Sequence, residues 1–182
     1  MISNFIETGK ELLLNPTDAL IKLRDEKLDQ AFIFFLLIIA VFTVLSTIVT
    51  AIMTPAENPV FFFGGYALGA FIGSIVLVLI CTGILHIFAF ILGGINSIDQ
   101  TLKAVIYSFV PVALLGWIPL VGLISFIWAA ILLIFALREL QKMSTMHAAL
   151  TVILPIIVLI VFIIAAFFAF VSVVDTAYAP II

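Results

Sequence analysis

Long uncharged runs, separated by short polar turns, are the dominant pattern along the chain. The first run covers residues 31–53, and the second covers residues 60–92. A helix needs about 20 apolar residues to cross the hydrocarbon core of a bilayer, so each run predicts a transmembrane helix. Because the second run is longer than one perpendicular crossing requires, we expect its start, residues 61–64, to be interfacial or irregular. Pro55 and Pro59 indicate a turn between the two helices.

Three more helices are expected in the second half of the chain. A third covers about residues 98–115, a fourth ends near Leu137, and a fifth covers about residues 145–174. Ser97 and Gln100 match a capping box, in which each side chain binds the main-chain N–H of the other residue. The fold class is therefore all-α, a polytopic membrane bundle of five transmembrane helices. Since the third and fourth helices are short, a re-entrant hairpin is the alternative for that pair.

The first 30 residues form a separate amphipathic segment. Apolar side chains recur there at helical spacing before Asn15, and Pro16 favours the start of a second short helix. Six acidic residues and the lack of a leading apolar core distinguish this segment from a cleavable signal peptide, so we expect the first transmembrane helix to act as the targeting segment. Three parts follow: a cytoplasmic segment at 1–30, a transmembrane domain at 31–174 and an external tail at 175–182.

The basic residues predict which side of the membrane each loop occupies. With five crossings, the N-terminal segment, the second loop and the fourth loop share one side. All seven lysines and arginines fall in these segments: Lys10, Lys22, Arg24, Lys27, Lys103, Arg138 and Lys142. Basic residues near helix ends mark the cytoplasmic side. We therefore expect a multi-pass protein of the cell membrane, with its N-terminus in the cytoplasm and its C-terminus outside.

Composition agrees with this topology and narrows the range of functions. The 182 residues are 66% hydrophobic and 9% charged, whereas soluble domains average about 45–50% apolar and about 25% charged. The net charge of −3 gives no indication of nucleic-acid binding. The single cysteine, Cys81, lies in an apolar run without metal-ligand spacing, and we interpret it as a packing residue.

Two stripes of side chains are candidates for helix packing. One consists of glycines on the second helix, and the other consists of hydroxyl side chains on one face of the first helix. Their members are Gly65, Gly69 and Gly73, and Thr43, Ser46, Thr47 and Thr50. Glycines four residues apart permit close approach of helices in lipid, so we expect these two faces to pack together, with hydroxyls bonded to helix carbonyls. The alternatives are a second copy of the chain against the glycines and a solute path lined by the hydroxyls.

Residues that could carry chemistry are few. Pro111 removes the hydrogen bond to the Tyr107 carbonyl and predicts a kink, where the hydroxyls of Tyr107 and Ser108 either compensate the freed carbonyl or form a binding notch. His86 and His147 have no partner at metal-ligand spacing, and no acidic or basic residue lies well inside a crossing. We therefore expect no catalytic residue, no metal and no cofactor.

Several short motifs appear together from Gly93 onward. They are Gly93 to Leu102, Tyr107-Ser108-x-x-Pro111, Trp117-Ile118-Pro119, Leu137-Arg138-Glu139-Leu140, Ala148-Ala149 and Leu154-Pro155, and Asn15-Pro16 precedes them. In this combination the chain resembles the Yip1 domain family, and Tyr-Ser-x-x-Pro is the most specific motif. The resemblance implies five crossings and a cytoplasmic N-terminus.

The same resemblance bears on function. Eukaryotic relatives associate with Rab GTPases and act in ER–Golgi vesicle traffic, but this sequence shows neither their long cytosolic N-terminal region nor an Asp-Leu-Tyr-Gly-Pro element. It looks more like the compact bacterial and archaeal members. We expect a non-enzymatic membrane protein that organises the lipid bilayer, membrane-associated protein partners or copies of itself. The alternative is a small passive channel or transporter that uses the hydroxyl stripe.

Overall fold

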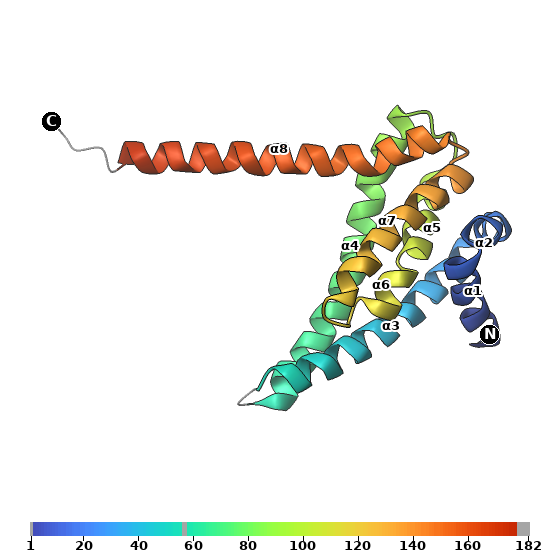
Figure 1. Ribbon diagram of the computed structural model, residues 1–182, viewed down its shortest axis with the longest axis horizontal. Coiled ribbons are helices and arrows are strands. Elements are labelled where there is room, and N and C mark those ends of the chain that lie inside the picture. The colour runs from blue at the N-terminus through green and yellow to red at the C-terminus, as the bar shows by residue number, and fades with distance from the viewer. Residues whose placement is uncertain (1, 56–57, 178–182) are drawn as a thin grey trace.

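Every element in the described part of the chain is a helix (Figure 1). The computed structural model describes residues 2–55 and 58–177. The helices are α1 Ile2–Leu14, α2 Pro16–Leu23, α3 Leu28–Met53, α4 Pro59–Ile91, α5 Ile98–Ser108, α6 Val110–Leu115, α7 Val121–Leu140 and α8 Thr145–Ala177. Five segments are long and apolar enough to cross a membrane: α3, α4, α5 together with α6, α7 and α8. The prediction of an all-α protein with five such helices is confirmed.

Helices α3 to α7 form the bundle that carries the core. In Figure 1, α3 and α4 meet at the tip opposite α1 and α2 and diverge from there, and α5, α6 and α7 lie in the angle between them. Phe35 and Ile39 of α3 and Leu137 of α7 are fully buried in one core cluster. The aromatic rings of Phe35 and Phe42 both meet the edge of Phe109, which ties α3 to the junction between α5 and α6.

Helix α8 differs from the expected bundle helix. It packs against α4 and α7 through its first turns, where Ala148 and Val152 are buried. From Ile156 to Val171 every side chain is exposed, and in Figure 1 the helix leaves the bundle as a single rod. Its 33 residues span about 50 Å. Helix α8 therefore shares only its first turns with the other helices of the bundle.

The start of α4 and the break between α5 and α6 bear on two further expectations. Helix α4 begins at Pro59 and continues without a break, so residues 61–64 are helical and not irregular, and their interfacial position stays a prediction. Asn58 caps it, since its side-chain oxygen accepts a hydrogen bond from the Phe61 N–H at 3.3 Å. The kink expected at Pro111 is confirmed, because α5 ends at Ser108 and α6 begins at Val110.

The N-terminal helices dock on one end of the bundle. Leu12 of α1 and Leu20 of α2 are fully buried, and burying such a side chain from water stabilises by about 1.5–3 kcal/mol. The ammonium of Lys22 lies 2.9 Å from the Glu11 carboxylate and joins the two helices. This hydrogen bond, together with the charge of Glu11, raises the pKa of Lys22 above its usual value. The short amphipathic helices predicted on either side of Asn15 are therefore present.

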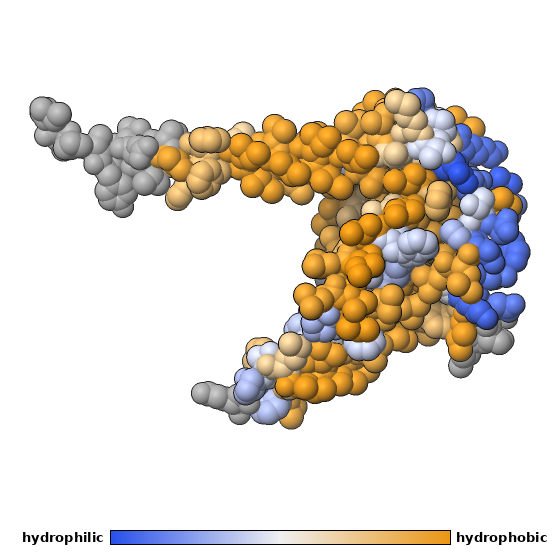
Figure 2. All heavy atoms as spheres, viewed as in Figure 1, coloured by the Kyte–Doolittle hydropathy of each residue, from blue (hydrophilic) through white to orange (hydrophobic). Residues whose placement is uncertain are grey.

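Charged side chains gather at this same end. Figure 2 shows a hydrophilic region along the edge formed by α1, α2 and the adjoining loops, whereas the visible surface of the bundle and of α8 is mostly hydrophobic. We call the region formed by α1, α2, the loop before α3, the start of α5 and the end of α7 the charged end. All seven basic residues lie in or beside these segments. Which side of the membrane the charged end faces stays a prediction.

Candidate functional site at the charged end

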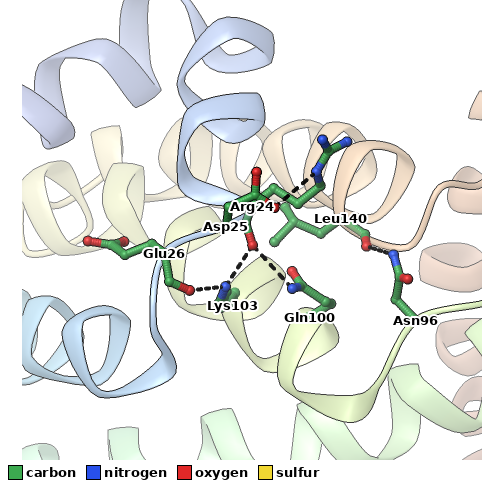
Figure 3. Close-up of polar contacts among 7 residues, drawn as sticks. All are labelled: Arg24, Asp25, Glu26, Asn96, Gln100, Lys103 and Leu140. Atoms are coloured by element: carbon green, nitrogen blue, oxygen red, sulfur yellow. Dashed lines mark hydrogen bonds and ion pairs between the residues drawn. The ribbon is translucent and has the colours of Figure 1, made fainter.

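A lysine inside the third crossing holds the loop that precedes α3. The Lys103 ammonium donates a hydrogen bond to the main-chain carbonyl of Arg24 at 2.8 Å and another to that of Glu26 (Figure 3). The side-chain amide of Gln100, one turn earlier on α5, donates to the same Arg24 carbonyl at 3.2 Å. Lys103 is only 3% exposed. A buried amino group requires such acceptors, so these carbonyls offset part of the cost of burying Lys103 at this position.

A tyrosine extends this contact from α5 toward α3. The Tyr107 hydroxyl donates a hydrogen bond to the Glu26 carboxylate, and the Tyr107 ring packs 5.8 Å from the ring of Phe34. Tyr107 is fully buried, whereas Glu26 is partly exposed. Lys103 and Tyr107 lie one turn apart on α5, so a single helix face binds both the main chain and the side chain of Glu26.

A buried glutamine organises the neighbouring loops. The Gln141 side chain, 1% exposed, donates to the Ser97 carbonyl at 3.0 Å and to the Thr101 hydroxyl at 2.8 Å. Its own carbonyl oxygen accepts from the Asn96 N–H at 3.0 Å. The Asn96 side chain in turn donates to the Leu140 carbonyl. These four hydrogen bonds join the end of α7 to the start of α5 and the loop before it, and so fix the second and fourth loops against each other.

A histidine completes this network. His86 Nδ1 lies 2.9 Å from the Thr101 hydroxyl, which also accepts from Gln141. In the described part of the chain, no group of three or more His, Cys, Asp or Glu side chains is placed to hold a metal ion. His86 therefore takes part in a hydrogen-bonded network, and its contacts are those of a structural side chain.

The capping box predicted at Ser97 and Gln100 is wrong. Ser97 is the residue before α5, but its side chain makes no capping hydrogen bond. The Gln100 side chain instead reaches Arg24, which lies 76 positions earlier. A long-range acceptor has thus replaced the local one. Ser144, in contrast, caps α8, since its hydroxyl accepts a hydrogen bond from the His147 N–H at 3.2 Å.

The hydroxyl stripe of α3 is bonded to its own helix. Ser46 and Thr47 donate to the Thr43 carbonyl at 3.1 Å and 2.7 Å, in agreement with the expectation that these hydroxyls bond helix carbonyls. Thr43 and Ser46 are buried, while Thr47 and Thr50 are half-buried. The Thr43 hydroxyl oxygen is itself buried without a hydrogen-bond partner among the described residues.

The glycine stripe of α4 lies elsewhere than expected. A Cβ atom built on Gly65, Gly69 or Gly73 meets no atom of the described structure within 4 Å. The buried face of α4 begins at Val78, nine residues after Gly69, which corresponds to a rotation of about 180° around the helix. The glycines therefore point away from the side of α4 that packs in the bundle. Their expected packing against the hydroxyl stripe is absent from the single chain.

The residues of the Tyr-Ser-x-x-Pro motif contact different parts of the structure. Ser108 donates to the Val105 carbonyl at 2.8 Å within α5, next to the kink before Pro111. The Tyr107 hydroxyl points to Glu26, so it does not compensate a carbonyl freed by the proline. Sequence reasoning named Tyr107 and Ser108 but missed their different partners. It also missed Lys103, Gln100 and Gln141 as site residues.

One signal for Lys103 was present in the sequence. It is a charged residue inside the third apolar segment, a position where ionisable side chains face the protein interior. The sequence analysis placed Lys103 in the second loop and expected no charged residue well inside a crossing. That expectation is wrong for Lys103, which lies buried in the second turn of α5. No comparable signal marked Gln141, since a glutamine near a helix end is ordinary and its three partners lie in other elements.

The fold and these contacts define a class of protein. Five apolar helices, with all seven basic residues gathered at one end of the bundle and its loops, are typical of a polytopic helical integral membrane protein. The family model of the Yip1 domain matches residues 10–167, which is most of the chain, and the chain belongs to the Yip1 domain family. No curated protein and no solved structure matches the chain.

Proposed function

We propose that this protein organises partner proteins or the bilayer at the cell membrane, without an enzymatic reaction, and that its charged end faces the cytoplasm. The observation that carries the proposal is the way the charged end is built. Lys103 and Gln100 hold the loop after α2 against α5, so α1 and α2 form a fixed platform on the bundle. Basic residues gathered at one end favour the cytoplasmic side.

The surface of the platform supports this role. Asp18 and Lys22 of α2 and Glu7 and Lys10 of α1 have exposed or half-exposed side chains of both signs. Polar, mixed-charge surfaces of this kind suit reversible protein contacts. The rest of the described surface is mainly apolar and suits lipid (Figure 2). The platform is therefore where we expect water-soluble or membrane-associated partners to bind.

Site-specific photo-crosslinking in intact cells tests the proposal. A photo-reactive amino acid at Asp18 should form protein adducts of defined mass, while the same amino acid at Ile124, an exposed apolar position of α7, should form lipid adducts only. The reversed-charge variant Lys22→Glu should weaken the Asp18 adducts. Equal protein adducts at Asp18 and Ile124, or none at Asp18, would contradict a platform for partners.

A passive solute path along α3 is the competing function. Two of the four hydroxyls of the stripe are bonded within α3, which leaves them less free to line a path. Purified protein in liposomes should therefore give no solute flux above that of empty liposomes, and Thr47→Val should change nothing. Flux that Thr47→Val abolishes would replace the organising role with transport.

A further inference from the structure

Two neighbouring cavities are lined by residues of both α1 and α3. The first has a volume of about 320 Å³ and is lined by Phe5, Thr8, Glu26, Gln30, Ile33, Phe34 and Leu37. The second has a volume of about 340 Å³ and is lined by Phe5, Ile6, Gly9, Lys10, Leu13, Leu14, Phe34, Ile38 and Leu114. Each volume is within the range of sites that bind small molecules, about 300–1,000 Å³.

An aromatic pair marks the boundary of the two cavities. The rings of Phe5 and Phe34 lie 5.2 Å apart, and both residues line both cavities. The cavities therefore adjoin along this pair and form one groove between α1 and the bundle. We call this groove the α1 groove.

The two halves of the α1 groove differ in polarity. The second cavity is almost wholly apolar, with Lys10 as its one charged lining residue. The first combines apolar walls with the side chains of Thr8, Glu26 and Gln30, of which Glu26 alone is charged. A groove with one anionic polar half and one apolar half complements an amphiphile with a cationic head.

The Glu26 carboxylate is positioned for such a head group. One of its oxygens, Oε2, accepts from Tyr107, and the ionised carboxylate has further acceptor positions. Figure 3 shows the carboxylate pointing away from Lys103, which binds the main chain of Glu26. The Lys103 ammonium thus binds main-chain carbonyls and not the Glu26 carboxylate. The Glu26 carboxylate can therefore face a cation in the groove.

We propose that the α1 groove binds a phospholipid with a primary ammonium head, of the phosphatidylethanolamine type. The ammonium lies against Glu26, Gln30 and Thr8, and an acyl chain passes Phe5 and Phe34 into the apolar half. The source is the bilayer, because Ile33 and Leu37 at the edge of the groove are 44% and 40% exposed on the apolar surface of α3. This site does not depend on whether α1 and α2 bind partner proteins.

Native mass spectrometry of the full chain in mild detergent tests head-group selection. Phosphatidylethanolamine, phosphatidylcholine and phosphatidylglycerol with identical acyl chains are added separately. We expect one phosphatidylethanolamine per chain, retained about tenfold better than phosphatidylglycerol. Soluble phosphoethanolamine should not displace it, since the apolar half stays unfilled. Equal retention of the three lipids would overturn the choice of head group, and displacement by phosphoethanolamine would assign the site to a soluble amine.

The matched pair Glu26→Gln and Asp25→Asn tests the role of the carboxylate. Each change removes one negative charge from the same loop, but only Glu26 lines the groove, and the Asp25 side chain is 84% exposed. Glu26→Gln keeps an acceptor for the Tyr107 hydroxyl and should lower retention of phosphatidylethanolamine about tenfold. Asp25→Asn should leave retention unchanged. The same loss in both variants would mean that only net charge matters.

The variant Gly9→Leu tests the apolar half without changing the charge. A Cβ at Gly9 meets no described atom within 4 Å, and leucine favours the helix more than glycine does. The added side chain should occupy the second cavity and lower retention of all three lipids, with the melting temperature unchanged or higher. Full retention of phosphatidylethanolamine by Gly9→Leu would overturn the proposal even if Glu26→Gln failed to fold.

Discussion

The Lys103 ammonium lies 2.8 Å from the main-chain carbonyl of Arg24, although 79 positions separate the two residues in the chain. This contact joins the third crossing to the loop that follows the N-terminal helices. It places a charged group inside an apolar segment and gives that group carbonyl partners.

Replacing Lys103 with methionine should destabilise the fold. Lys103→Met removes the donor to the carbonyls of Arg24 and Glu26 and leaves both facing an apolar side chain. Loss of hydrogen bonds to a charged group predicts a decrease of about 1.5–3 kcal/mol in the free energy of unfolding. Thermal unfolding in mild detergent measures it. Lys27→Met is the control, since the Lys27 side chain is exposed. A melting temperature for Lys103→Met equal to that of the control would refute the expectation.

Removing the Tyr107 hydroxyl should have a smaller effect. Tyr107→Phe loses one hydrogen bond to Glu26, a carboxylate that is partly exposed and can bind water instead. We expect a cost of about 0.5–1.5 kcal/mol. A double-mutant cycle with Glu26→Ala, which removes the acceptor of this hydrogen bond, should give a positive coupling between the two positions. Additive losses would show that the hydroxyl and the carboxylate do not interact in the folded protein.

Two glycines should respond in opposite ways to a larger side chain. Gly69→Leu should leave the stability of the single chain unchanged, because a Cβ there meets no described atom within 4 Å. Gly94→Ala should destabilise by about 1–3 kcal/mol, because its Cβ would lie 2.9 Å from the Ala89 carbonyl oxygen. Thermal unfolding and size-exclusion chromatography with light scattering distinguish the cases. If Gly69→Leu instead dissociates a dimer, the glycine stripe contacts a second copy.

Cysteine labelling tests the proposed orientation. In a Cys81→Ala background, a cysteine at Asn58 should react with a membrane-impermeant maleimide in intact cells, and cysteines at Asp25 and Met146 should react only after lysis. All three side chains are exposed, whereas Gln141 is buried and unsuited to the assay. Tyr178 of the expected external tail lies outside the described residues. Labelling of Met146 in intact cells would contradict five crossings with a cytoplasmic N-terminus.

The sequence by itself determined the number of membrane-spanning helices and where each approximately lies. Runs of apolar residues longer than about 20 can satisfy their main-chain hydrogen bonds in lipid only as helices. Local signals also set the break at Asn15 and Pro16, the kink before Pro111 and the cap at Ser144. Each of these features depends on residues within a few positions of one another, so a single sequence carries the information.

Only the tertiary structure decided which faces meet. The glycine spacing of α4 permits close packing on any partner, and the face that packs in the bundle proved to be the opposite one, with Val78. The Gln100 side chain could have bonded the nearby Ser97 N–H but binds the Arg24 carbonyl. The Gln141 side chain binds Ser97 in the second loop and Thr101 in α5. Such choices depend on how helices far apart in the chain are placed against each other. The apolar pattern, which is similar on most sides of α4 and α8, does not specify that placement.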